Sequence, residues 1–266
     1  MLAVRGLPAD RREWGTAMCA ELAGVRGSRA RWVFGLGCAR TAIVLRLRSR
    51  VLGRDRGGNG VRAFVVAGAA GALALSLYGL VRYPALRAGP GAWAGLAALA
   101  VILLGYVALA LSLTRGTGAE ALVARGAGMA GGALVGAAWL AVIVPGATPK
   151  ALVAVPLAAS LLVPAVVAAL VRRATASGRA GTDAALWSGL VGALLAFVVW
   201  VSATYASDGR PYDAQLVRDF HRSGAHDLAA YAVGDTLAGA IGLLVIIPVV
   251  AVALGSLGVR AARASV

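Results

Sequence analysis

Six apolar segments, each about as long as a membrane-spanning helix, dominate this sequence. A transmembrane helix needs about 20 predominantly apolar residues to cross about 30 Å of hydrocarbon. Only 14% of the residues are charged, and these cluster between the apolar segments. The pattern predicts an all-α fold, a polytopic membrane helix bundle with six transmembrane helices within residues 62–258. The segments cover approximately residues 63–81, 92–113, 127–146, 151–171, 184–206 and 234–257.

The third segment is the least certain to cross fully, because it is rich in glycine. It contains Gly128, Gly132 and Gly136, and the sixth segment contains Gly234, Ala238 and Gly242 at the same spacing. Small residues four positions apart let helix backbones approach closely. The two strips therefore predict either a homo-oligomer contact or packing inside one bundle, and the second alternative is favoured in a chain so rich in Ala and Gly.

The basic residues indicate how the bundle is oriented. A net charge of +15 can indicate nucleic-acid binding, but these side chains lie at the ends of apolar segments and not on one polar domain. We therefore expect the lipid bilayer as a partner and no nucleic acid. Most of the 26 Lys and Arg residues lie on one side if the N-terminus is inside. The positive-inside rule then places both termini in the cytoplasm, including a short tail at residues 259–266.

Residues 1–61 form a polar, basic prefix ahead of the apolar segments. Asp10 and Glu13 have the spacing of a capping box, and Ser28 can cap a second helix. Both predicted helices carry apolar faces, while their arginines make a membrane span unfavourable. We therefore expect an N-terminal cytoplasmic helical hairpin over residues 9–48, lying on the membrane surface and contacting a cytoplasmic protein, followed by a linker.

The external loop at residues 207–233 holds both histidines of the chain. Asp219, His221, His226 and Asp227 are its candidate functional polar residues, because His and Asp can bind a metal or respond to pH. The two histidines are five positions apart and do not share a helical face, so the spacing predicts no metal site. We expect a solvated, amphipathic loop with Asp–Arg pairing.

Asp235 follows this loop, at the outer end of the sixth segment. An ionisable residue at membrane depth is costly and is a functional candidate by default. It either lines a path for solutes or protons, or it caps the start of the sixth helix. The cap is the favoured alternative.

Two stretches carry a resemblance to a known group. They are Arg12–Leu22 with Phe34–Arg40, and His226–Gly258 with the sequence Tyr231-Ala232-Val233-Gly234-Asp235. Together they resemble uncharacterised multi-pass integral membrane proteins of high-GC Gram-positive bacteria. The arginine-rich, lysine-poor composition, with Lys150 as the single lysine, is also typical of a GC-rich genome. The resemblance implies the bacterial cytoplasmic membrane and supplies no functional residues.

Three classes of function remain. The chain has no Walker, metalloprotease, nucleophile-elbow or dinucleotide-binding motif, so we expect no enzyme and no cofactor. A regulatory or signalling membrane protein is slightly favoured, because the prefix is suited to bind a partner and the segments hold few polar groups. The alternative is a small-solute permease or the membrane subunit of a transporter, indicated by prolines in the fourth and sixth segments and by Asp235.

Overall fold

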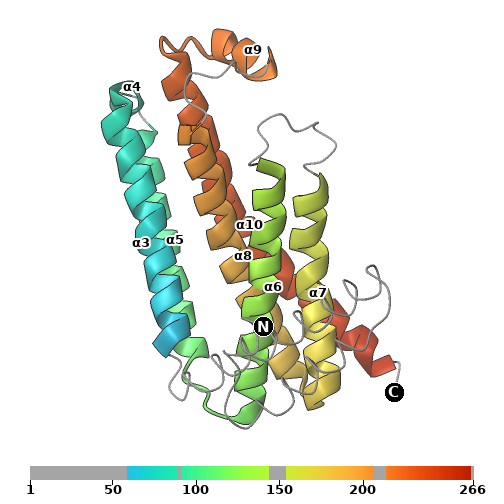
Figure 1. Ribbon diagram of the computed structural model, residues 1–266. Coiled ribbons are helices and arrows are strands. Elements are labelled where there is room, and N and C mark those ends of the chain that lie inside the picture. The colour runs from blue at the N-terminus through green and yellow to red at the C-terminus, as the bar shows by residue number, and fades with distance from the viewer. Residues whose placement is uncertain (1–58, 89–90, 144–153, 207–213, 265–266) are drawn as a thin grey trace, which may run out of the picture. The chain divides into compact units, whose positions relative to one another are not determined.

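The computed structural model describes residues 59–88, 91–143, 154–206 and 214–264. The hairpin expected over residues 9–48 lies outside these ranges. Every regular element in them is a helix (Figure 1). The helices are α3 (Asn59–Arg82), α4 (Pro84–Ala88), α5 (Ala92–Leu113), α6 (Ala119–Ile143), α7 (Ala154–Thr175), α8 (Gly178–Ala206), α9 (Ala214–Ser223) and α10 (Leu228–Ala264).

Six of these helices, α3, α5, α6, α7, α8 and α10, are long and apolar enough to cross a membrane. Their outward faces carry large apolar side chains: Val101 and Leu104 are each 69% exposed, and Val249 is 63% exposed. A water-soluble protein would cover such surfaces or place polar residues on them. The predicted six-helix membrane bundle is therefore confirmed, including the glycine-rich third span, and the chain is a multi-pass integral membrane protein.

Several helices are longer than the apolar segments that predicted them. Helix α6 begins at Ala119, α8 at Gly178 and α10 at Leu228, each several residues before the expected span. Hydropathy identifies only the apolar part of a helix. The helical backbone hydrogen bonds continue beyond it into more polar sequence, so the helices are longer than the apolar segments. The end of α10 at Ala264 likewise lies within the segment expected as a tail.

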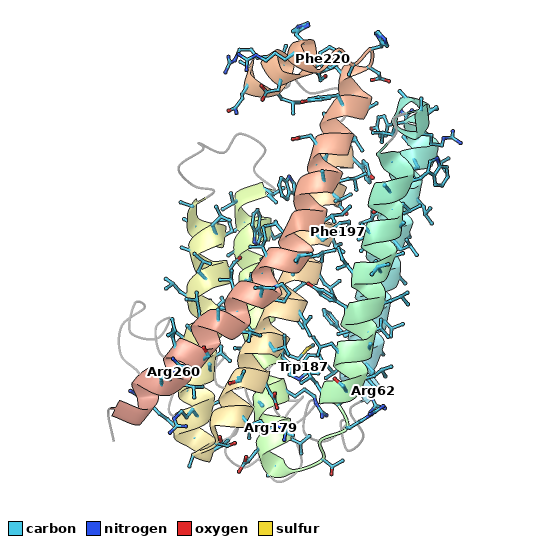
Figure 2. All side chains as sticks on the ribbon, turned by 180° about the vertical axis from the view of Figure 1, so that it is seen from behind. Arg62, Arg179, Trp187, Phe197, Phe220 and Arg260 are labelled. Carbon is cyan, nitrogen blue, oxygen red and sulfur yellow. The ribbon has the colours of Figure 1, made fainter. Side chains whose placement is uncertain are left out.

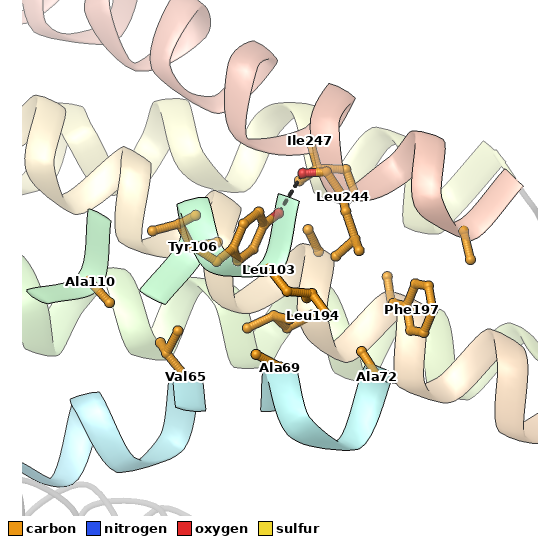
Figure 3. Close-up of a cluster of buried hydrophobic side chains, with 14 of the residues drawn as sticks. Val65, Ala69, Ala72, Leu103, Tyr106, Ala110, Leu194, Phe197, Leu244 and Ile247 are labelled. Atoms are coloured by element: carbon orange, nitrogen blue, oxygen red, sulfur yellow. Dashed lines mark hydrogen bonds between the residues drawn. The ribbon is translucent and has the colours of Figure 1, made fainter. Parts of the chain in front are cut away.

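Helix α8 is the centre of the part of the bundle that the structure describes. Of its most apolar stretch 72% is buried, against 22–39% for the other five spans. Leu190, Leu194 and Phe197 of α8 belong to the main hydrophobic cluster. They share it with Val65 and Ala69 of α3, and with α5 and α10 side chains (Figure 3).

Helix α6 packs closely against α8 through its glycine strip. A Cβ atom on Gly132 would lie 2.5 Å from Val191 Cβ, and one on Gly136 would lie 2.6 Å from Leu195 Cδ1. A Cβ atom on Gly128 would collide with Trp187. In this structure the strip of the third span thus serves packing inside one chain.

Helix α10 crosses the bundle obliquely (Figures 1 and 2). Near its start, Leu237 and Ile241 face a cavity shared with α5. Near its end, Gly258 packs against α7, where a Cβ atom would lie 2.6 Å from the carbonyl oxygen of Ala165. One helix therefore contacts the α3–α5 pair at one end of the bundle and α7 at the other.

Candidate functional site

An apolar cavity of about 360 Å³ lies between α3, α4, α5 and α10. Its position is in the half of the bundle where α3 ends and where α5 and α10 begin. This volume is within the range of small-molecule sites in proteins. The lining residues are Ser76, Leu80, Leu86, Gly91, Ala92, Gly95, Leu96, Leu99, Gly234, Leu237, Ala238 and Ile241.

Glycine residues, which have no side chain, line part of this cavity. Gly91 and Gly95 of α5 border it, and a Cβ atom on either would meet nothing within 4 Å. Gly234 and Ala238 border it from α10. These two belong to the second strip of small residues, while a Cβ on Gly242, the third member, would meet nothing within 4 Å. A Cβ atom on Gly234, in contrast, would lie 3.0 Å from Leu86 Cδ2, so the second strip has open space at Gly242 and a close neighbour at Gly234.

The chemistry of the lining is almost entirely hydrocarbon. Among the described lining residues one carries a hydroxyl, Ser76, which donates a hydrogen bond of 2.9 Å to the carbonyl oxygen of Ala72 in its own helix. Among the residues that the structure describes, no charged side chain lines the cavity. The arrangement can accommodate an apolar group and offers nothing that would bind an ion or a polar solute.

Aromatic side chains mark the level of the bundle at which the cavity lies. Tyr205 of α8 contacts Tyr78 edge-on at 5.2 Å and stacks on Tyr83 at 6.4 Å between ring centroids. Its hydroxyl donates to the carbonyl oxygen of Leu75 at 2.8 Å. Trp93, next to the cavity-lining Ala92, is 61% exposed. Tyr and Trp are enriched at the membrane–water interface of membrane proteins, and these aromatic residues lie at the same end of the bundle as the cavity.

The external-loop candidates fall on α9 and on the turn that follows it. Arg222 pairs with Asp219 at 3.5 Å, and His221 is exposed beside the ring of Phe220. Phe220 contacts Tyr231 of α10 at 5.8 Å between centroids. The helix is thus amphipathic, with apolar contacts to α10 on one face and charges on the other. Across the described ranges, no three His, Cys, Asp or Glu side chains come together as a metal site would require.

Asp227, and not Asp235, caps α10. The backbone N–H of Ala230 donates to Asp227 Oδ1 at 3.0 Å, and the helix begins at Leu228. Asp235 lies two turns inside the helix, is exposed, and is absent from the cavity lining. The prediction that Asp235 caps the sixth helix is therefore wrong, because the helix begins before its apolar segment does.

The opposite end of the bundle carries two arginines that sequence reasoning did not single out. Arg62 Nε donates to Thr114 Oγ1 at 2.6 Å, and Arg125 donates to the carbonyl oxygen of Gly116 at 3.0 Å. Arg125 is only 4% exposed. Both side chains hold the turn between α5 and α6. The available signal was Arg125 itself, which lies two positions before the start of the predicted third span.

No family model, curated protein sequence or solved structure matches this chain. The fold therefore defines the class, a multi-pass integral membrane protein, and the site is an apolar cavity near one end of its bundle.

Proposed function

We propose that the chain is a regulatory or signalling protein of the bacterial cytoplasmic membrane. In this proposal both termini are cytoplasmic, and residues 9–48 bind a cytoplasmic protein. The bundle supplies the membrane-embedded part that responds to the bilayer or to an apolar molecule within it.

The distribution of buried polar groups is the observation that carries this proposal. A permease for polar solutes needs polar groups that line a path through the bundle. In the part of the chain that the structure describes, the hydroxyls of Ser76 and Thr114 donate to carbonyls of their own helices. Ser160 does the same at 2.7 Å, and it also accepts the indole N–H of Trp139. The buried polar side chains are Ser76, Thr114, Arg125, Ser160 and Ser188.

These groups lie singly on different helices, and most are satisfied locally. Ser188 Oγ is packed against Gly131 in the tight α6–α8 contact, where a Cβ on the glycine would lie 2.8 Å away. Asp235, which favoured transport on sequence grounds, does not line the cavity. The described bundle is thus suited to packing and to holding apolar groups, which favours regulation over transport of polar solutes.

The arrangement of arginines supports the proposed orientation. Figure 2 shows Arg62, Arg179 and Arg260 at one end of the bundle and Phe220 of α9 at the other. Basic residues are retained on the cytoplasmic side of a membrane protein. The cavity then belongs to the outer half of the bundle, and the proposed partner-binding prefix to the inner side.

Crosslinking the intact protein in its native membranes, followed by purification and mass spectrometry, tests the proposal. A cytosolic regulatory protein in the eluate is the expected result. The variant Trp14→Ser with Leu22→Ser, which removes two apolar residues from the prefix, should lose that protein. The variant Trp93→Ser, which removes an exposed aromatic residue near the cavity, should retain it. Recovery of an ATP-binding subunit in place of a regulator would support the transporter and refute the regulatory role.

A further inference from the structure

We infer that the cavity between α3, α4, α5 and α10 holds an acyl chain of a membrane phospholipid, with the lipid phosphate beside Arg87. This binding site is independent of whether the protein acts as a regulator. It follows from the lining of the cavity, its open edge and the charge next to it.

This cavity is poorly suited to hold water, and leaving it empty would be unfavourable. A buried water needs two to four polar partners, and the one lining hydroxyl, Ser76, already donates to Ala72. An empty cavity would deprive Leu80, Leu96 and Leu99 of contact atoms on one side. A hydrocarbon chain in the cavity would restore those contacts and needs no hydrogen-bond partners.

The cavity is open at one edge and closed at its floor. Leu99 is fully buried, and Ser76 and Leu80 are 4% and 7% exposed. Gly91 of α5 and Ala238 of α10 are exposed. The open edge therefore lies between α5 and α10, two helices whose outward faces meet lipid. The acyl chain of a neighbouring lipid is the apolar group present there at the highest concentration.

A cation follows directly in sequence after a residue that lines the cavity. Leu86 of the short helix α4 lines the cavity, and the next residue, Arg87, is exposed. The exposed Trp93 indicates that this level is the membrane interface. A phosphate at that depth can accept charge-assisted hydrogen bonds from a guanidinium group. An acyl chain in the cavity and a phosphate at Arg87 are together the two ends of one phospholipid.

Filling the cavity tests the acyl-chain part. Gly95→Leu places a side chain in the cavity from α5, and Ala238→Leu does so from α10. Gly105→Leu is the matched control for the glycine variant, because it lies on the same helix, also has nothing within 4 Å of its Cβ, and does not line the cavity. Each full-length variant is purified in detergent, checked for folding by circular dichroism, and analysed by native mass spectrometry for retained phospholipid.

Wild type and Gly105→Leu are expected to retain phospholipid, while Gly95→Leu and Ala238→Leu retain several-fold less. Undiminished retention in both cavity variants would overturn the proposal. So would a wild-type protein that carries no lipid, or one whose added mass is a second copy of the chain or another protein.

A competition between phospholipid and diacylglycerol with the same chains tests the phosphate part. Wild type should prefer the phospholipid, and Arg87→Gln should lose that preference. Arg218→Gln, which removes an exposed arginine of α9 at the same end, should keep it. Equal preference in wild type and Arg87→Gln would refute the role of Arg87.

Discussion

The hydroxyl of Tyr106 on α5 donates a buried hydrogen bond of 2.5 Å to the carbonyl oxygen of Leu244 on α10 (Figure 3). In a regular helix this carbonyl would accept the N–H of residue 248, four positions later. Residue 248 is a proline and has no N–H. The tyrosine therefore supplies the donor that the proline removes. Prolines are tolerated in membrane helices where a neighbouring helix satisfies the freed carbonyl in this way.

Tyr106→Phe should destabilise the bundle by about 1–3 kcal/mol, because it leaves the Leu244 carbonyl without its donor in an apolar interior. Pro248→Ala restores a backbone N–H at the right position. In that background Tyr106→Phe should cost clearly less, since the helix then satisfies the carbonyl itself. Unfolding titrations of the four proteins in mixed detergent measure this coupling. Equal costs in both backgrounds would show that the two residues act independently.

Gly132→Ala should destabilise the α6–α8 contact by about 1–3 kcal/mol, because the new methyl group would lie too close to Val191. Gly105→Ala serves as the control, since a Cβ there meets nothing within 4 Å and alanine favours a helix. Thermal unfolding in detergent compares the two. A Gly132→Ala variant as stable as Gly105→Ala would contradict the close packing of these helices.

Asp227→Ala should lower stability by about 1 kcal/mol, because it removes the acceptor for the Ala230 N–H at the start of α10. Asp227→Asn should leave the stability almost unchanged, since asparagine is an equally good cap. Asp235→Ala, two turns inside the helix, removes no cap and should leave this hydrogen bond intact. Hydrogen exchange of the first turn of α10 distinguishes the variants. Loss of protection in Asp235→Ala alone would restore the sequence-based assignment.

Reporter fusions test the proposed orientation. Fusions after residues 118, 178 and 266 should all report the cytoplasm, and a fusion after residue 215 should report the opposite side. The reason is that most of the Lys and Arg residues then lie on the cytoplasmic side, Arg62, Arg179 and Arg260 among them (Figure 2). A reporter at Val266 that is active only outside the cytoplasm would contradict the proposed orientation.

The sequence was sufficient for those features that depend on local composition. Six apolar stretches predicted six membrane helices, and the second stretch matches α5, Ala92–Leu113, residue for residue. A proline within the last span also implies that some neighbouring group must donate to the backbone carbonyl that the proline leaves free. The identity of that group could not be predicted, because Tyr106 and Leu244 are 138 positions apart and meet only through the fold.

The cavity could not be predicted for a similar reason. The two strips of small residues look alike in sequence, yet a Cβ atom on Gly132 would lie 2.5 Å from Val191 Cβ, while a Cβ atom on Gly242 would meet nothing within 4 Å. Whether a missing side chain brings helices together or leaves a space depends on the position of the neighbouring helix. The start of α10 was misplaced because hydropathy marks the lipid-embedded part and not the capping residue, Asp227.

The length of α10 exceeds what a helix perpendicular to the bilayer would need. Its 37 residues correspond to about 55 Å of helix, at about 1.5 Å per residue. Between Asp235 and Arg260 no residue is charged, and this stretch alone measures about 36 Å. This stretch is longer than about 30 Å of hydrocarbon, so α10 is long enough to span the bilayer with some tilt. Tilting is one way in which a long apolar stretch is accommodated in a bilayer, and α10 does cross the bundle obliquely (Figure 1).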